Sequence, residues 1–278
     1  MKKYWQNKYI IPVILYIILI VVSFIMILPF LWTLSSSFKF DQEIFEFPIR
    51  WIPKVFRSVN YEEVWTKLTF VTYYLNTFKV TIIVTIGQIL FCSLAAYAFA
   101  KLEFPGRNLI FMLYIGSMMI PWHAIMIPQF IIVNSLGLFN THWAVIVLQL
   151  FSAFGIFLLR QNMLSIPNSL CEAARIDGYS EIRIFANIIM PLCKAALATL
   201  AIFAFNFMWN DYLGPTIYLN SPHLKTLQLA LAMFRLQYGM QYGLIMAGTV
   251  SALAPMVIVY VIAQKYLIEG VASAGLKG

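Results

Sequence analysis

Long apolar segments separated by short groups of charged residues dominate the sequence. The stretch from Ile10 to Phe38 contains no Asp, Glu, Lys or Arg, and neither does the interval between Arg107 and Arg160. A helix crosses the hydrocarbon core of a bilayer with about 20 apolar residues, at about 1.5 Å per residue. The interval between Arg107 and Arg160 is therefore too long for one crossing, and the polar turn NSLGLFNTH (134–142) is expected to divide it into two.

This pattern predicts an all-α integral membrane protein with six transmembrane helices. The predicted spans are 10–38, 74–100, 108–133, 142–160, 191–210 and 241–264. The connecting segments are an N-terminal segment (1–9), an external loop (39–73), a loop at 161–190, a second external loop (211–240) and a tail (265–278). The first apolar run is longer than the 7–15 residues of a signal-peptide core and lacks an A-x-A-like end, so we expect it to be retained as a span.

The distribution of Lys and Arg predicts that both termini are cytoplasmic. In that orientation the cytoplasmic segments carry 11 basic and 5 acidic residues, a net charge of +6, whereas the external segments carry 7 basic and 6 acidic residues, a net charge of +1. An excess of Lys and Arg marks the cytoplasmic side of membrane proteins. The loop 161–190 is therefore predicted to be cytoplasmic.

Composition supports the membrane class and excludes several others. The chain is 62% hydrophobic and 11% charged, whereas a soluble domain carries roughly 25% charged residues. The net charge of +8 does not indicate nucleic-acid binding, because the basic residues are not clustered and no nucleic-acid motif is present. Cys92, Cys171 and Cys193 lack metal-ligand or CxxC spacing, so we expect free thiols and no metal site.

Residues 172–191, EAARIDGYSEIRIFANIIMP, concentrate charge in an otherwise apolar chain. A helix can begin at Ser169, because Ser169 and Glu172 have the S-x-x-E spacing of a capping box, and Ser165 is an alternative N-cap. Gly178 suits the left-handed position that follows a helix. The pattern predicts a helix that ends at this glycine.

A second helix is predicted after the glycine, with Ser180 as its N-cap, Glu181 near its positive end and Pro191 at the turn into the next span. Apolar residues recur on one side of each helix: Ile166, Leu170 and Ala173 in the first, and Ile182, Phe185, Ala186 and Ile189 in the second. The residues alone leave two interpretations open. The element is either a docking site for another protein or an amphipathic loop on the inner leaflet.

The spacing of this element resembles the EAA signature of permease subunits from binding-protein-dependent ABC importers. The signature positions are Glu172, Ala173, Ala174, Gly178, Ile188 and Pro191, with Met190 where the family usually has Leu. Further stretches resemble the carbohydrate branch of the family, in its short, six-span, maltose-type form: FPGR (104–107), MMIPWHAIMIPQF (118–130), SLGLFNT (135–141), LRQNMLSIPNSLCEAARIDG (159–178), FNFMWNDYLGP (205–215) and GLKG (275–278).

The resemblance implies that the loop 161–190 docks in a cleft of a cytoplasmic ATPase and carries its closing motion to the spans. The residues implied in docking are Glu172, Ala173, Ala174, Arg175, Asp177, Gly178 and Pro191. The sequence contains no G-x-x-x-x-G-K-[ST], so the chain is not predicted to be an enzyme or to hold a cofactor, and a partner binds ATP and Mg²⁺.

The implied assembly lies in the plasma or inner membrane. It contains this multi-pass chain, a second homologous permease subunit and two ATPase subunits, and it receives a carbohydrate from an extracellular solute-binding protein. The two external loops are the expected surfaces for that protein. Within them, VNYEEVWTK (59–67) and TLQLALAMFRL (226–236) are predicted to form short helices.

Polar and aromatic side chains in the spans are candidates for the translocation path, because polar groups in a membrane usually face the interior of a bundle. The candidates are Trp32, Asn76, Gln88, Asn206, Trp209, Asn210 and Asp211, and a wider set adds Ser35 to Ser37, Thr81, Thr85, Trp122, Gln149 and Tyr212. The alternative for each is structural: aromatic residues anchor span ends at the membrane interface, and amides or hydroxyls bond to neighbouring helices.

A secondary active carrier and an intramembrane protease are the alternatives to ATP-driven import for such a membrane chain. A secondary active carrier without an ATPase commonly has an acid or His midway through the membrane, and His123 is the one plausible group. An intramembrane metalloprotease requires H-E-x-x-H, which is absent. The sequence therefore predicts the permease subunit of a carbohydrate importer that works by alternating access.

Overall fold

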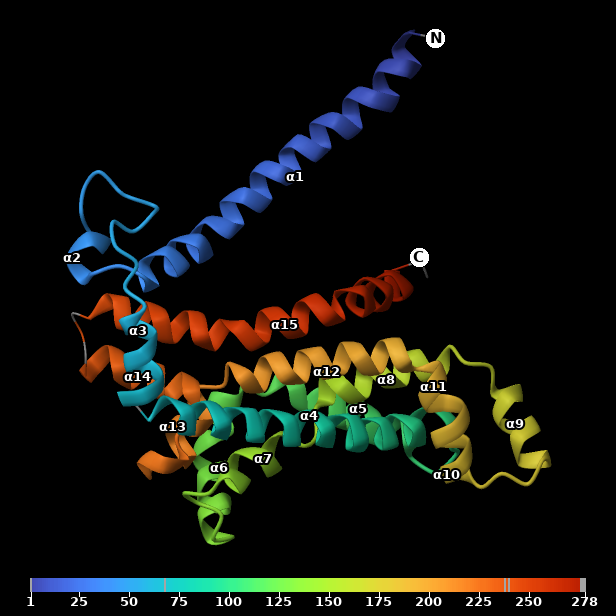
Figure 1. The fold of residues 1–278 in the computed structure, drawn as a ribbon. Helices are drawn as coiled ribbons and strands as arrows, with labels where there is room; N and C mark the ends of the chain where they lie inside the picture. Colours follow the sequence, from blue (N-terminus) through green and yellow to red (C-terminus); the bar gives the residue numbers. More distant parts are fainter. Residues whose placement is uncertain (1, 68, 238, 240, 276–278) are drawn as a thin grey trace. The chain divides into compact units, whose positions relative to one another are not determined.

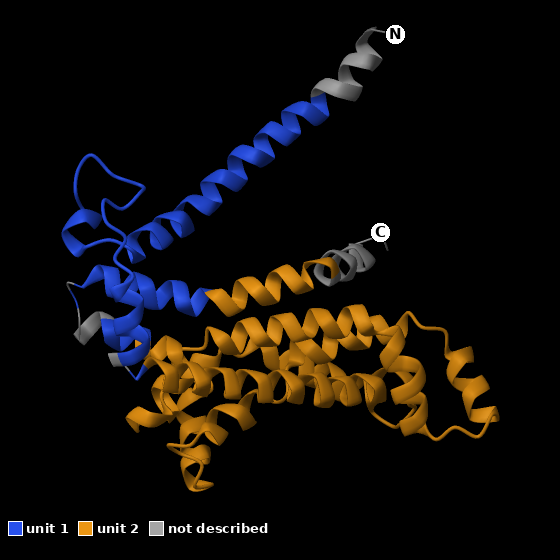
Figure 2. Ribbon diagram, viewed as in Figure 1, with its two compact units in different colours: residues 1–69, 231–253 blue, residues 70–230, 254–278 orange. Residues whose placement is uncertain are grey.

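The computed structural model describes residues 2–67, 69–237, 239 and 241–275, and no strand occurs among them (Figure 1). The chain forms two compact units (Figure 2). Unit 1 comprises residues 1–69 and 231–253, and unit 2 comprises residues 70–230 and 254–278. The prediction of an all-helical protein is confirmed for the described part of the chain.

Four to six intervals of the described chain are suited to cross a membrane. Four of these intervals are single helices that are long and apolar enough: Ile11–Ser37, Phe70–Lys101, His142–Leu164 and Tyr242–Lys265. Two more are bent pairs, Arg107–Met119 with Trp122–Ser135 at 104°, and Glu181–Leu192 with Lys194–Trp209 at 82°. The count reaches six when each bent pair is taken as one span.

Unit 1 contains α1 (Lys2–Ser37), α2 (Asp41–Ile44), α3 (Val59–Glu62) and the π-helical turn η1 (Glu63–Lys67), together with parts of α14 (Leu227–Gln237) and α15 (Tyr242–Gly275). The amide of Asn60 closes the end of α1 by donating to the carbonyls of Ser37 at 2.9 Å and Lys39 at 3.2 Å. These bonds satisfy carbonyls that a helix end leaves without partners. The short helices expected within 59–67 and 226–236 are confirmed.

Lys39 is buried in unit 1, although it follows directly after the first span. Its Nζ donates to the carbonyl of Arg50 and lies 4.2 Å from the centre of the Trp32 ring. Burial lowers the pKa of the Lys39 amine, and the nearby Glu43 carboxylate opposes this shift. Trp32 also meets Trp51 edge to face at 5.5 Å. Lys39 and these aromatic rings therefore fold the segment that follows α1 back onto the end of that helix.

The core of unit 2 is formed by α4 (Phe70–Lys101), α8 (Ala153–Leu164) and α12 (Lys194–Trp209), which lie side by side (Figure 1). Gly155 allows their close approach, because a Cβ at this position would lie 2.8 Å from Leu200 Cδ1 and 3.3 Å from Cys92 Sγ. The three cysteines are buried free thiols, as the sequence predicts. Among the described helices, α7 (His142–Gln149) also packs on α4.

The interval predicted as the third span consists of α5 (Arg107–Gly116), the 3-10 turn η2 (Ser117–Met119) and α6 (Trp122–Ser135). The chain bends by 104° between them, at Pro121. A proline disfavours the helical conformation of the residue before it, and Ile120 accordingly has an extended ψ of 114°. The chain turns again after α6, at the polar stretch that the sequence predicts as a break.

Candidate functional site

The loop between the fourth and fifth predicted spans contains α9 (Asn168–Ile176), α10 (Glu181–Ile184), the π-helical turn η3 (Phe185–Ile189) and α11 (Met190–Leu192). The predicted capping box at Ser169 is wrong. α9 begins at Asn168 after Pro167, whose extended backbone places Ser169 inside the first turn, and no side chain caps this end. The alternative cap, Ser165, instead donates to the carbonyl of Asn162 at the end of α8.

The end of α9 matches the prediction. Gly178 has a φ of +80°, and its N–H donates to the carbonyl of Arg175 at 3.0 Å. The next N–H, of Tyr179, donates to the carbonyl of Ala174 at 2.9 Å. These two bonds make a Schellman motif, which needs a left-handed residue at the position of Gly178.

The second helix begins as expected, since the Ser180 hydroxyl accepts from the N–H of Arg183 at 3.4 Å. It continues through the π-helical turn η3 to Leu192. Pro191 lies in its last turn, and the chain then bends by 82° into α12. The helix pair is therefore continuous with the span that follows it.

The two predicted apolar faces are only partly buried in the chain. Cys171 and Ala174 pack into the core, whereas Ala173 is exposed, as is Leu170. In the second helix Ile184, Phe185 and Ile189 are buried. In α9, in α10 and in the turn between them, the large apolar side chains that stay exposed are Leu170, Ile176, Tyr179 and Ile182, with Ile176 at 87% and Ile182 at 78%. We call these four residues the outer apolar face. The exposed Glu172 carboxylate belongs to the same helix pair.

Side chains of α4 form hydrogen bonds near the start of each helix of the pair. Lys101 Nζ donates to the carbonyl of Ile166 at 2.6 Å and to Asn168 Oδ1 at 2.8 Å. Tyr97 Oη donates to Glu181 Oε2 at 2.6 Å. These bonds secure the beginning of both α9 and α10.

Glu181 also joins the two helices to each other. Arg175 Nε donates to Glu181 Oε1 at 2.7 Å. This bond, followed by the one from Tyr97, lowers the pKa of the Glu181 carboxyl, and Glu181 in turn raises the pKa of Arg175. Glu181 is therefore held in its ionised form.

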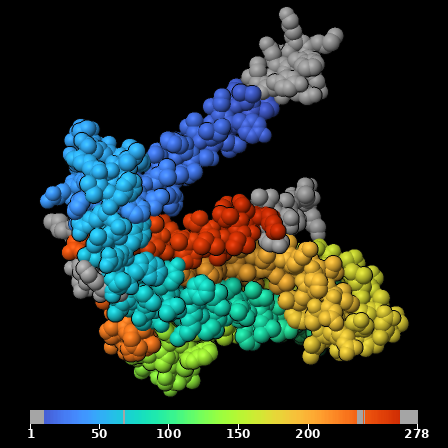
Figure 3. Space-filling model, viewed as in Figure 1, coloured from blue at the N-terminus to red at the C-terminus, as the bar shows by residue number. Residues whose placement is uncertain are grey.

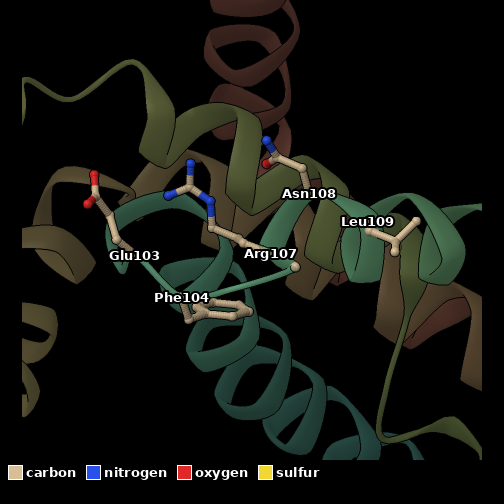
Figure 4. Close-up of a pocket in the computed structure, with 6 residues that line it drawn as sticks. Glu103, Phe104, Arg107, Asn108 and Leu109 are labelled. Atoms are coloured by element: carbon tan, nitrogen blue, oxygen red, sulfur yellow. The ribbon is translucent and has the colours of Figure 1, made fainter.

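A groove of about 560 Å³ lies between α9 and the end of α4, and Lys101, Leu102, Glu103, Asn168, Cys171, Glu172, Arg175 and Glu181 line it. A smaller pocket of about 340 Å³ adjoins the loop between α4 and α5 (Figure 4). Figure 4 shows the polar ends of Glu103, Arg107 and Asn108 on one side of that loop and the Phe104 ring on the other. In Figure 3 the atoms of α9 to α11, yellow to orange, gather at one end of unit 2.

A second cavity lies at the other end of α12 and has a volume of about 720 Å³. Trp122, Gln149, Asn206, Phe207, Asn210, Asp211, Tyr212, Leu213 and Gly214 line it. They come from α6, α7, α12, the turn 210–212 and the start of α13 (Leu213–Tyr218). Figure 1 shows α13 and α9 at opposite ends of the helices in unit 2.

Hydrogen bonds fix the polar groups of this cavity. The Asn210 amide donates to the carbonyl and to Oδ1 of Asn206, both at 2.9 Å. Asp211 Oδ1 accepts from the N–H of Gly214 at 3.1 Å and so orders the turn before α13. Burial raises the pKa of the Asp211 carboxyl, and backbone N–H donors oppose the shift. The cavity thus combines amides and a carboxyl with the aromatic rings of Trp122 and Tyr212.

Of the seven path candidates, the structure brings Asn206, Asn210 and Asp211 together in the cavity. Gln88 lies next to it, because its Nε2 donates at 2.7 Å to the carbonyl of the lining residue Gln149. Phe207, Leu213 and Gly214 also line the cavity, and no sequence signal other than their proximity to Asn210 and Asp211 points to them.

Trp209 and Asn76 contribute to the packing of unit 2 instead. Trp209 is 0% exposed, stacks on Phe205 at 5.6 Å and meets Tyr74 edge to face at 5.4 Å. The Asn76 amide donates to the carbonyls of His223 and Lys225, at 2.8 and 3.0 Å. It thereby holds the loop that contains the 3-10 turn η4 (Pro222–Leu224). Trp32 belongs to unit 1, described above.

Comparison with known proteins places the whole chain among transporter subunits. The arabinooligosaccharides transport system permease protein AraQ of Halalkalibacterium halodurans is 34% identical over 92% of this chain and 93% of its own length. The probable starch degradation products transport system permease protein AmyC of Thermoanaerobacterium thermosulfurigenes is 34% identical over the full length of both chains. The lactose transport system permease protein LacG of Rhizobium radiobacter is 30% identical over 93% of this chain and 94% of its own.

A solved structure has the same fold over nearly the full length. It is a bacterial ABC transporter involved in the import of the acidic polysaccharide alginate, with a TM-score of 0.85 and 25% identity over 94% of this chain and 98% of the matched chain. The family pattern described as "binding-protein-dependent transport system inner membrane component" matches residues 88–273, which include both the helix pair and the cavity. The chain therefore belongs to the family of binding-protein-dependent transport system inner membrane components.

Proposed function

We propose that this protein is the permease subunit of an ATP-driven importer for uncharged oligosaccharides. The observation that carries the proposal is the presence of two distinct sites at opposite ends of one helical unit. An exposed helix pair lies at one end, and a polar and aromatic cavity lies at the other. Such an arrangement suits a subunit that receives motion at one membrane surface and controls a solute path from the other.

The outer apolar face of the helix pair is the proposed docking site for a cytoplasmic ATPase. Ile176 and Ile182 are large, apolar and 87% and 78% exposed, so their side chains are available to contact a partner. Glu172 and Ala173 are exposed beside them. In the proposed orientation both termini and this helix pair are cytoplasmic, and two ATPase subunits of the assembly bind ATP and Mg²⁺.

The cavity is the proposed part of the sugar path. Its volume lies within the range of about 300–1,000 Å³ that is typical of ligand sites. The Trp122 and Tyr212 rings can pack against the apolar faces of sugar rings, and Asn206, Asn210 and Asp211 can hydrogen-bond hydroxyl groups. A second homologous permease subunit would complete the path.

The charge of the cavity favours an uncharged substrate. Among the described residues that line it, none is Lys, Arg or His, and Asp211 is the one carboxyl. A uronate would bring a second negative charge to Asp211 without a lining cation to offset it. The relatives named for arabinooligosaccharides, starch degradation products and lactose all concern uncharged sugars.

A secondary active carrier without an ATPase explains the residues in the spans less well. None of the four unbent candidate spans contains Asp or Glu. His123 is exposed at the start of α6, next to the bend at Pro121, rather than paired inside the unit. The family pattern itself describes transport that depends on a binding protein.

The proposal is tested by uptake into proteoliposomes that contain this chain with its partner permease and ATPase, and with the binding protein outside. The probes are arabinotriose, maltotriose, lactose and, as the acidic comparison, trigalacturonate. We expect ATP-dependent uptake of a neutral sugar and none of trigalacturonate. Tyr212→Ala should reduce the uptake, whereas Trp143→Ala, which changes an exposed aromatic outside the cavity, should not. Uptake without ATP, or of trigalacturonate alone, would refute the proposal.

A further inference from the structure

Both oxygens of the Glu181 carboxylate are used inside the chain. One accepts from Tyr97 on α4 and the other from Arg175 on α9, at 2.6 and 2.7 Å. Charge-assisted hydrogen bonds of this length are among the stronger interactions of proteins. Arg175, which the sequence suggests as a docking residue, therefore has an internal partner.

The burial of Tyr97 is what makes the contact between Tyr97, Glu181 and Arg175 rigid. The Arg175 and Glu181 side chains are 40% and 41% exposed, and an ion pair of that kind contributes little by itself. Tyr97, however, is only 4% exposed and packs against Phe185 at 5.4 Å. Its hydroxyl gives Glu181 a fixed position from which Arg175 is held.

A second contact acts in parallel from the same helix. Lys101 is one turn beyond Tyr97 on α4, and residues four apart lie on the same face of a helix. Lys101 bonds to Ile166 and Asn168 at the start of α9, while Tyr97 reaches the end of α9 through Glu181 and Arg175. One face of α4 therefore bonds directly to the start of α9, and it contacts the end of α9 through Glu181.

We infer that Glu181 is a positioning residue that locks α9 to α4 through Arg175 and Tyr97, so that the docking helix and this span move as one body. The inference rests on the proposed docking of α9 to an ATPase and goes beyond it by identifying the span that follows the motion. Without this contact, α9 is joined to the spans through Lys101, through the packing of Cys171 and Ala174 in the core, and through its backbone connections to α8 and α12.

The same span reaches the cavity. Gln88 of α4 donates to the carbonyl of Gln149, a residue that lines the cavity and lies next to the break between α7 and α8. Movement of α4 would therefore displace the backbone at the cavity wall. The structure provides one continuous set of contacts from α9 through α4 to the cavity.

The test measures whether α9 and α4 keep a fixed separation during the ATPase cycle. Spin labels are placed at Ser169 on α9 and Leu94 on α4, which are both exposed and both outside the outer apolar face. The complex with its partner subunits is compared at rest and after trapping with ATP and vanadate. In the otherwise native chain we expect the same narrow distance distribution in both states.

Three variants weaken the contact between Tyr97, Glu181 and Arg175, which we call the lock. They are Tyr97→Phe, Glu181→Gln and Arg175→Gln. Each should broaden the distribution and make it differ between the two states, and each should lower ATP hydrolysis stimulated by the binding protein more than basal hydrolysis. The exchange Arg175→Glu with Glu181→Arg should recover part of the narrow distribution. Arg183→Gln, which removes a like charge from the same helix pair outside the lock, is the matched control.

Two results would overturn the inference. One is a Ser169–Leu94 distance that changes on trapping in the native chain, and the other is a distribution that stays narrow in all three variants. Failure of the proposed function looks different, because then no ATPase co-purifies with the native chain and no trapped state forms.

Discussion

Substitutions at Gly178 test whether backbone strain or side-chain size limits this position, because the two predict different orders of transport activity among the variants. Its φ is +80°, and a Cβ built on it meets no atom of the chain within 4 Å. A substitution therefore adds no clash inside the chain, and its cost is that of placing a side chain in the left-handed region. For an ordinary L-residue that cost is about 1–2 kcal/mol. It changes the ratio of formed to unformed turn by a factor of about 5–30.

The variants are Gly178→Asn, Gly178→Ala and Gly178→Val. Asn is larger than Ala but enters the left-handed region far more readily, and a β-branched residue tolerates it least. If the turn must be formed for α9 to transmit motion, ATP-driven uptake should fall in the order Gly, Asn, Ala, Val. The assay is the initial rate of uptake by proteoliposomes, divided by the amount of assembled complex.

A different order would refute the reasoning. If Ala works better than Asn, the restriction at this position is the space that a partner leaves rather than the backbone conformation. If Val equals Gly, the left-handed turn is not needed for transport at all.

Three further predictions follow from the cavity and its surroundings. Trp209→Ala should cost about 3–5 kcal/mol of stability because it empties a fully buried site, and a fall in the thermal unfolding temperature would show this, whereas Tyr212→Ala should reduce uptake with little change in stability. Asp211→Asn should preserve or raise the unfolding temperature at neutral pH, because burial raises the pKa of this carboxyl and its ionised form therefore costs stability above that pKa, but uptake should fall; a lower unfolding temperature would contradict this. Asn76→Ala leaves the carbonyls of His223 and Lys225 without their amide donor and should lower stability by about 1–3 kcal/mol, which a matched Asn220→Ala should not do.

The sequence predicted those features that depend on local chemistry. Apolar runs long enough to cross a membrane predicted the helices, and the glycine at 178 with Ser180 predicted the turn of the helix pair, both of which the structure contains. The prediction at Ser169 failed because two signals competed there. Pro167 fixes an extended residue immediately before Asn168, and this starts the helix one residue ahead of the capping box.

Which polar and aromatic groups face the cavity was not accessible from the sequence. Trp209 and Asn210 are neighbours on one helix end, yet the first is wholly buried between helices and the second lines the cavity. Their separation depends on how α12 is rotated against α4, which a one-dimensional pattern does not specify. Asn76 and Gln88 likewise donate to backbone carbonyls of residues that lie far away in the sequence.

The partners of Arg175 and Glu181 show the same limit. The sequence placed both in a charged helix pair, but it gave no indication that Tyr97 of an earlier span reaches Glu181. A contact over such a separation becomes visible only once α4 is packed against the helix pair.

The central claim is that the outer apolar face meets an ATP-hydrolysing protein on the cytoplasmic side of the membrane. The most direct measurement places a photo-crosslinking amino acid at Ile176 in living cells, with Phe47, 89% exposed in the loop that we propose is external, as the matched position. The account predicts that Ile176 links to the ATPase subunit and that Phe47 does not. A link from Phe47 to that subunit, or reaction of Ile176 with external proteins alone, would contradict it.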